Sequence, residues 1–434
     1  MNRKKHLVNV VTLGCSKNLV DSEHLMRQLE VGGYQLVHDS DSTDAKIVAI
    51  NTCGFIGDAK EESINTILNF AAAKEQGLIH KLFVFGCLSE RYRDELRVEI
   101  PEVDSFFGVK DMADILKVLQ VEERQQLLGE RYLTTPSHYA YLKISEGCSW
   151  GCSYCAIPLI RGKHLSVPME ELVAEAEHLA AKGVKELIVI AQDTTYYGLD
   201  LYGERKLAEL VRRLSGIAGI EWIRLHYAYP NQFPQDLIEE LRDNPKVCKY
   251  LDVPFQHINT NVLSQMRRGI GKEETYDFIK RLRNSVPDIA LRTTLMVGHP
   301  GEDEQAFDEL KEFVQTVQFD RMGVFTYSEE EGTYGAKQLE DIIPEEVKQQ
   351  RADELMAIQQ KVAKANNGKR VGEVLNVLVD RVEGDFFIAR TQYDSPEVDQ
   401  EVLLNNDSMM LTIGSFYKVK ITSNDDFDLY GELV

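Results

Sequence analysis

The sequence predicts an α/β protein in which two parallel βα series are followed by a small all-β module. Three observations support this fold class: apolar runs alternate with amphipathic helical patterns from residue 8 to residue 109, the same alternation returns from residue 139 to residue 326, and short alternating strands fill residues 373–434. At 434 residues the chain is too long for one ordinary core. We therefore expect two or three domains.

A cysteine follows each predicted strand of the first series. The strands cover residues 8–13, 47–50 and 82–85, and the cysteines are Cys15, Cys53 and Cys87. Because the carboxyl ends of parallel strands form one rim where ligands bind, the three thiols are expected to converge in a Rossmann-like domain. Three buried structural cysteines are the alternative. The adjacent residues Gly14, Gly54 and Gly86 favour a bulky ligand, because glycine lets the backbone approach it closely.

The second series predicts an incomplete parallel barrel of the TIM type, with six βα units and one open side. Its strands are predicted at residues 139–144, 186–190, 222–226, 250–253, 290–297 and 321–326. Helical patterns lie between them at residues 169–181, 207–214, 235–241, 275–286 and 304–317. Polar clusters follow several strands, and their recurrence favours a ligand above the barrel mouth.

A CxxxCxxC run, formed by Cys148, Cys152 and Cys155, follows the first barrel strand. Three thiolates at this spacing can ligate three irons of a cubane cluster and leave the fourth iron open for an external ligand. A zinc site is the alternative, and it needs a fourth ligand such as His164. Disulfides are disfavoured, because seven cysteines is an odd number and the chain shows no export signal. Cys248 stands apart from both triads and is expected to be a buried thiol.

The last part of the chain predicts a small β-barrel or sandwich after an amphipathic helix at residues 344–366. From Lys369 to Val434 there are 6 basic and 13 acidic residues, a local net charge of -7. The whole chain has a formal net charge of -21. Both values disfavour binding to a phosphate backbone and favour a basic partner or simple solubility.

Membrane attachment is not expected. No apolar stretch is long enough to span a bilayer, and nothing resembles a lipidation signal. The sequence therefore predicts a cytoplasmic protein.

Taken together, these motifs resemble one family, the radical S-adenosylmethionine methylthiotransferases. The resemblance rests on residues 12–23 (TLGCSKNLVDSE), the Cys53-Gly54 and Gly86-Cys87 pairs, the CxxxCxxC run and the acidic C-terminal module, and it covers essentially the whole chain. Residues 13–23 resemble the RimO branch, which modifies a ribosomal protein, more than the MiaB branch, which modifies tRNA. The resemblance implies a methylthiotransferase N-terminal domain at residues 4–122, a radical barrel at 134–366 and a TRAM module at 367–434.

The resemblance also implies two 4Fe-4S clusters and S-adenosylmethionine as cofactors. One cluster would be held by Cys148, Cys152 and Cys155 and would generate the radical, whereas an auxiliary cluster on Cys15, Cys53 and Cys87 would hold sulfur. No catalytic residue is expected beyond these ligands. Candidates for contacts to S-adenosylmethionine are Tyr154, beside two of the ligands, and residues placed at strand ends: Gln192, Asp193, Gln256, Arg292 and Gly298.

The implied reaction is methylthiolation of the β-carbon of an aspartate in small-subunit ribosomal protein number twelve. An unactivated C–H bond of this kind calls for a radical rather than for acid-base catalysis. The expected partners are that basic protein, possibly within the assembled ribosome, an electron donor and a sulfur source, with no membrane and no nucleic acid as direct substrate. Methylthiolation of an adenosine in tRNA is the runner-up, and a non-enzymatic metal-binding adaptor is a third reading.

Overall fold

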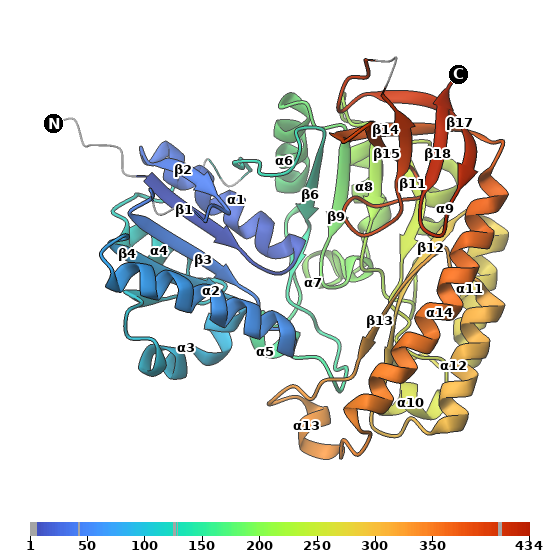
Figure 1. Cartoon of the computed structure of the whole chain (residues 1–434), viewed down its shortest axis with the longest axis horizontal. Helices are drawn as coiled ribbons and strands as arrows, with labels where there is room; N and C mark the ends of the chain where they lie inside the picture. The colour runs from blue at the N-terminus through green and yellow to red at the C-terminus, as the bar shows by residue number, and fades with distance from the viewer. Residues whose placement is uncertain (1–6, 42–43, 125–126, 128, 407–409) are drawn as a thin grey trace. The chain divides into compact units, whose positions relative to one another are not determined.

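A computed structural model describes residues 7–41, 44–124, 127, 129–406 and 410–434 (Figure 1). The chain divides into two compact units. The first contains the residues up to Thr135 together with Tyr141–Trp150 and Ala156–Leu179, and the second contains Pro136–Ala140, Gly151–Cys155 and Ala180–Val434. The start of the predicted N-terminal domain, residues 4–6, lies outside the described residues. No helix in the described part of the chain is long and apolar enough to cross a membrane.

The first unit contains a parallel five-stranded sheet with the order β2-β1-β3-β4-β5. Its strands are β1 (Leu7–Thr12), β2 (Gln35–His38), β3 (Ile47–Thr52), β4 (Lys81–Gly86) and β5 (Ser105–Phe106). This is the doubly wound order in which the chain turns back between β1 and β3, so a crevice opens at their carboxyl ends.

Helices cover both faces of this sheet: α1 (Ser16–Val31), α2 (Gly57–Glu75), α3 (Cys87–Glu99) and α4 (Met112–Val118). One apolar core packs α1 and α4 on one face, and a second packs α2 and α3 on the other. Both faces of β1, β3 and β4 are buried, which explains their nearly continuous apolar runs. The segments that follow are β7 (Ser145–Glu146), α5 (Ile157–Ile160), β8 (Leu165–Ser166) and α6 (Met169–Ala181).

A six-stranded sheet with the order β13-β12-β11-β10-β9-β6 forms the predicted incomplete barrel. Its strands are β6 (Tyr139–Lys143), β9 (Glu186–Ile190), β10 (Trp222–Leu225), β11 (Val247–Asp252), β12 (Ala290–Val297) and β13 (Arg321–Thr326). Between them lie η2 (Thr194–Tyr196), α7 (Leu199–Tyr202), α8 (Leu207–Ser215), α9 (Gln235–Asp243), α10 (Thr260–Gln265), α11 (Lys272–Ser285) and α12 (Glu304–Val317). Neighbouring strands from β9 to β13 pair in parallel, and over the described residues the sheet does not close between β13 and β6.

After α13 (Tyr334–Gln338), the long helix α14 (Glu345–Arg370) runs alongside β13 and α12 (Figure 1). It was predicted to end at residue 366, but it continues through Gly368 to Arg370. The predicted domain boundary at 366/367 therefore falls inside a helix. Its last turn is held by tertiary contacts, since Asn367 donates to the carbonyl of Phe427 at 3.2 Å, and such contacts outweigh the poor helix propensity of glycine.

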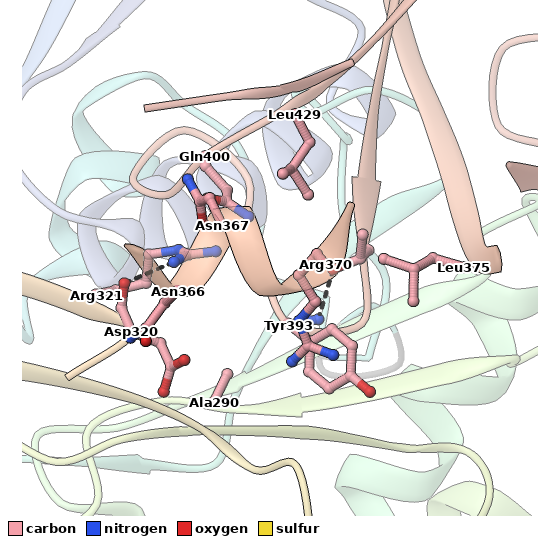
Figure 2. A pocket seen from close by; sticks show the side chains of 11 residues that line it. Ala290, Asp320, Arg321, Asn366, Asn367, Arg370, Leu375, Tyr393, Gln400 and Leu429 are labelled. Atoms are coloured by element: carbon pink, nitrogen blue, oxygen red, sulfur yellow. Dashed lines mark hydrogen bonds between the residues drawn. The ribbon is translucent and has the colours of Figure 1, made fainter. Parts of the chain in front are cut away.

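The C-terminal module is a closed barrel with the strand order β14-β15-β16-β18-β17, which decides between the predicted barrel and sandwich. Its strands are β14 (Val374–Glu383), β15 (Phe386–Thr391), β16 (Val402–Asn405), β17 (Phe416–Asn424) and β18 (Leu429–Leu433). A small cavity lies between α14 and this barrel, where the Arg370 guanidinium stacks 4.1 Å from the ring centroid of Tyr393 (Figure 2).

Charged side chains join the C-terminal barrel to the first residues of the parallel strands. Glu186, the first residue of β9, accepts from Arg224 at 2.7 Å and from Arg390 at 2.8 Å, and Arg390 also pairs with Asp380. The loop between β15 and β16 adds contacts, since Asp394 pairs with Arg321. We call residues 392–401 the β15–β16 loop; it contacts several strands of the sheet.

Candidate functional site

The first unit brings together Cys15, Cys53 and Cys87, which we call the N-terminal triad. Cys15 stands directly before α1, Cys53 follows the last residue of β3, and Cys87 is the first residue of α3. The three residues follow the carboxyl ends of β1, β3 and β4, which share one rim of the parallel sheet. Cys15 is exposed, whereas Cys53 and Cys87 are buried.

Glycines allow the three cysteine-bearing segments to approach one another. A Cβ atom on Gly14, which has a φ of +91°, would lie 2.7 Å from the Cβ and 3.0 Å from the Sγ of Cys53. A Cβ atom on Gly54 would lie 2.6 Å from the backbone nitrogen of Leu88, next to Cys87. In the structure, Gly14 and Gly54 make room for the neighbouring cysteine segments, and close approach to a ligand stays a prediction.

Burial disfavours the charged form of the two inner thiols. It raises the pKa of Cys53, and it raises the pKa of Cys87 to about 12, while the positive charge of Arg161 acts in the opposite direction at both sulfurs. A triad of thiolates in this place needs positive charge close by. An iron-sulfur core supplies such charge, so the donor set and its setting fit a cluster with one thiolate per iron.

Asn18 and Arg161 belong to this site although the sequence analysis did not identify them. The Arg161 guanidinium donates to the Asn18 side-chain oxygen at 2.5 Å, and the same oxygen lies 3.7 Å from the Cys87 sulfur. Arg161 follows Cys155 by six residues, yet it reaches a residue 143 positions earlier in the chain. Only the fold reveals this contact.

We call Cys148, Cys152 and Cys155 the loop triad; all three are half-buried. Backbone hydrogen bonds fix the loop that carries them. Cys148 donates to the carbonyl of Gly162 at 3.0 Å, and Cys155 donates to the carbonyl of Cys152 at 3.2 Å. Between them, Ser153 donates to Met266 at 3.0 Å, so the loop is held by residues that follow α10.

Arg268 is a second functional residue that sequence reasoning missed. Its guanidinium lies 3.7 Å from the Cys152 sulfur and 3.4 Å from the Tyr154 hydroxyl, and it stacks 4.2 Å from the ring centroid of Tyr229. The carbonyl of Pro254 anchors it at 2.5 Å. Burial raises the pKa of Tyr154 well above its usual value. The loop triad therefore has a buried cation and a neutral phenol beside it.

The zinc alternative receives no support from the ligand arrangement. Within the described ranges, no three His, Cys, Asp or Glu side chains are close enough to share one metal ion. His164, the proposed fourth ligand, is within 3.2 Å of the Ser166 hydroxyl.

The residues predicted to contact S-adenosylmethionine have different surroundings. Gln192 and Asp193 follow β9, and Asp193 caps the short helix η2 through a 2.9 Å bond from the Thr195 amide. Gln256 has a φ of +70°, and its amide donates to Thr294 at 2.9 Å. These positions agree with the predicted rim.

The other two candidates, Arg292 and Gly298, lie against neighbouring side chains, and their contact to S-adenosylmethionine stays a prediction. Arg292 is the third residue of β12 rather than a strand-end residue, and it pairs with Asp252 and Asp399, each at 3.3 Å. Gly298 does follow β12, but a Cβ there would lie 2.2 Å from the Lys348 side chain. The Lys348 side chain of α14 therefore packs against this glycine.

Cys248 is the buried thiol that the sequence predicted. It is 1% exposed and packs with Trp222, Tyr250, Ala290 and Leu378. Burial raises its pKa to about 12. It has no place in either triad.

Three family models match successive parts of the chain. Residues 7–108 match the uncharacterized protein family UPF0004, residues 142–314 match the radical SAM superfamily, and residues 371–434 match the TRAM domain. The TRAM match begins at the residue after α14 ends.

Solved structures resemble the fold. The radical S-adenosylmethionine methyltransferase TsrM from Kitasatospora setae aligns with a TM-score of 0.54 and 14% identity, covering 74% of this chain and 75% of that one. At this identity the likeness concerns the fold alone.

Curated relatives are similar over their whole length. The ribosomal protein uS12 methylthiotransferase RimO of Phocaeicola vulgatus is 58% identical, covering 99% of this chain and 100% of the relative. The protein of the same name from Bacteroides thetaiotaomicron is 57% identical, covering 100% of this chain and 99% of the relative. With these relatives and the three matched domains, the chain belongs to the radical S-adenosylmethionine methylthiotransferases, in the RimO family.

Proposed function

We propose that this enzyme transfers a methylthio group to the β-carbon of an aspartate in ribosomal protein uS12 and that it uses two 4Fe-4S clusters. The observation that carries the proposal is the presence of two cysteine triads in a chain that is 58% identical, over its relative's full length, to a protein named for this activity. The N-terminal triad would hold the auxiliary cluster, and the loop triad would hold the cluster that binds S-adenosylmethionine.

The clusters supply what side chains cannot, namely an electron to cleave S-adenosylmethionine and a site for sulfur. The residues around the loop triad determine the charge and the protonation near its sulfur atoms. Arg268 places a positive charge 3.7 Å from the Cys152 sulfur, and the buried Tyr154 hydroxyl stays protonated next to it. His299, within 3.3 Å of the Ser153 hydroxyl, is held neutral because burial lowers its pKa to about 4.

The charge of the C-terminal barrel supports a protein substrate over tRNA. Its net charge of -7 from Lys369 to Val434 complements a lysine- and arginine-rich protein and repels a phosphate backbone. Methylthiolation of a tRNA adenosine is therefore the second candidate. An electron donor and a sulfur source complete the proposed set of partners.

The cluster assignment can be tested by counting iron after anaerobic reconstitution with iron and sulfide. We expect about eight irons per chain, and about four when either triad is changed to alanine. Cys248→Ala is the matched control and should keep about eight, because Cys248 packs in an apolar cluster that contains no other cysteine. A count of about four in the unaltered chain would contradict the two-cluster proposal.

The substrate can be tested in a strain that lacks this enzyme. Mass spectrometry of uS12 should show loss of one methylthio group at an aspartate, while the tRNA nucleosides stay unchanged. Loss of a methylthio adenosine from tRNA with uS12 unaffected would favour the second candidate instead.

A further inference from the structure

A buried arginine lies between the N-terminal triad and a pair of carboxylates. Arg161 is 2% exposed, and its Nη1 atom donates to the two oxygens of Glu146 at 2.8 and 2.9 Å and to Asp21 at 3.2 Å. Its Nη2 atom points the other way, to the oxygen of Asn18 that also lies beside Cys87. The guanidinium thus has one edge on carboxylates and one edge toward the thiols.

The short segment that carries Arg161 also packs on Cys87. Ala156 and Ile160 form a buried apolar cluster with Cys87, and Val109 packs against it. Ala156 is bonded directly to Cys155, a member of the loop triad. Cys155 of the loop triad and Ala156, which packs on Cys87 of the N-terminal triad, are therefore consecutive residues.

We propose that Arg161 is a positioning residue of the N-terminal triad, where its guanidinium stabilises the thiolates and raises the reduction potential of the cluster held there. This inference rests on the proposed auxiliary cluster. Reduction adds negative charge to a core already surrounded by three thiolates, so a fixed positive charge in a buried site favours the reduced form. Arginine is suited to this role because it keeps its charge when buried.

Two further observations support this role. Asp21 and Glu146 are also bound by Lys143, so the carboxylates have a second cation and Arg161 is not their only partner. In addition, the Asn18 side chain that accepts from Arg161 donates its own amide to the carbonyls of Leu13 at 2.8 Å and Thr52 at 3.2 Å, in the segments that carry Cys15 and Cys53. The carboxylates thus do not depend on Arg161 alone, and Asn18 links its guanidinium to the segments that carry the triad.

The test uses the full-length chain with Cys148, Cys152 and Cys155 changed to alanine, so that only the N-terminal triad binds a cluster. The reduction potential is measured by a redox titration followed by electron paramagnetic resonance, together with iron per chain. Arg161→Gln should keep about four irons and lower the potential by at least about 59 mV, which corresponds to a tenfold change in a one-electron equilibrium. Arg161→Lys should restore most of the shift, since it keeps the charge.

Two additional variants serve as controls. Lys163→Gln removes an exposed positive charge two residues further along and should leave the potential unchanged. Because Arg161→Gln leaves Asp21 and Glu146 with Lys143 as their remaining cation, a double variant with Glu146→Gln removes one of the two carboxylates and is expected to limit the loss of stability. It should show the lowered potential as well.

Each outcome is decisive. Unchanged potential and iron content in the Gln and double variants would overturn the inference and leave Arg161 as a structural ion pair. Loss of iron in both of these variants, with retention in Arg161→Lys, would support it, because a positive charge at this position would then keep the cluster bound. If the parent with an intact N-terminal triad binds no iron, the proposed auxiliary cluster fails, and the inference falls with it.

Discussion

The guanidinium of Arg292 lies 3.3 Å from the carboxylate of Asp399. The arginine projects from β12 of the parallel sheet, and the aspartate belongs to the β15–β16 loop of the C-terminal barrel. The same loop reaches other strands, since Ser395 is within 2.9 Å of His226 and Glu397 accepts from Tyr139 at 3.0 Å. The C-terminal barrel is thus attached to the sheet by specific polar contacts.

Asp399→Asn should destabilise the protein, because Asp399 is 1% exposed and its loss leaves Arg292 with a single carboxylate partner. We expect the free energy of unfolding to fall by about 2 kcal/mol, measured by urea denaturation. Asp426→Asn removes the exposed pair with Lys364 and should cost less than about 1 kcal/mol. Equal losses in the two variants would show that the Arg292 pair does not anchor the barrel.

Strand positions could be predicted from the sequence where a strand carries a continuous or alternating apolar run. The strands β9, β12 and β13 have the predicted bounds, although only β9 is buried throughout, whereas β12 alternates and β13 is mostly half-buried. The strands β2 and β5 were not predicted. The first is an edge strand with one exposed and three half-buried residues, and the second has only two residues, so neither produces a clear pattern.

The candidate site was predictable only as far as its motifs extend. Cysteines at strand ends and in a CxxxCxxC run are visible in the sequence, but Arg161 and Arg268 contact partners 143 and 116 residues away. Arg292 was wrongly expected at a strand end. It lies in the predicted strand 290–297, but it is the third residue of that strand and not one of its last. Sequence periodicity indicates which side chains share a face of the sheet, but it does not indicate which distant residues pack against that face.

Gly14→Ala should lower cluster binding by the N-terminal triad, and backbone strain is not its only effect. Its φ of +91° penalises a side chain, and a Cβ would also lie 2.7 Å from the Cβ of Cys53. Gly33→Ala is the matched control, with a φ of +94° and nothing within 4 Å, so it should cost only about 1 kcal/mol. Iron counts after reconstitution should fall for Gly14→Ala and stay unchanged for Gly33→Ala. An unchanged count in both would contradict the tight packing at Cys53.

The attachment of the C-terminal barrel should weaken in acid. Burial opposes ionisation of Glu186 and Asp380, but Arg390 outweighs it and the pKa of both carboxyls is lowered. A carboxyl with a depressed pKa stabilises the fold above its unfolded pKa, about 4, and this stability is lost as the pH falls further. Melting temperatures between about pH 3 and pH 6 should therefore drop steeply below pH 4.

Glu186→Gln tests this explanation. The variant should be less stable at neutral pH, because Arg224 and Arg390 lose a charged partner, and it should show a shallower decline below about pH 4. A decline as steep as that of the unaltered protein would assign the acid sensitivity to other carboxyls.

A second loss of stability is expected at milder pH from His299, whose pKa burial lowers from 6.5 to about 4. The unfolded chain binds a proton below pH 6.5 that the folded chain excludes, so stability is highest above 6.5 and decreases as the pH falls toward 4. The loss amounts to about 3 kcal/mol at most, and His24, with a pKa lowered to about 3, adds to it with the same sign.

His299→Gln should reduce the slope of unfolding free energy against pH between 6.5 and 4, whereas His80→Gln, at an exposed position, should leave it unchanged. If the unfolding free energy of His299→Gln has the same slope against pH as that of the unaltered protein, the folded protein binds this proton as readily as the unfolded chain. His299 would then be protonated beside Ser153 in acid.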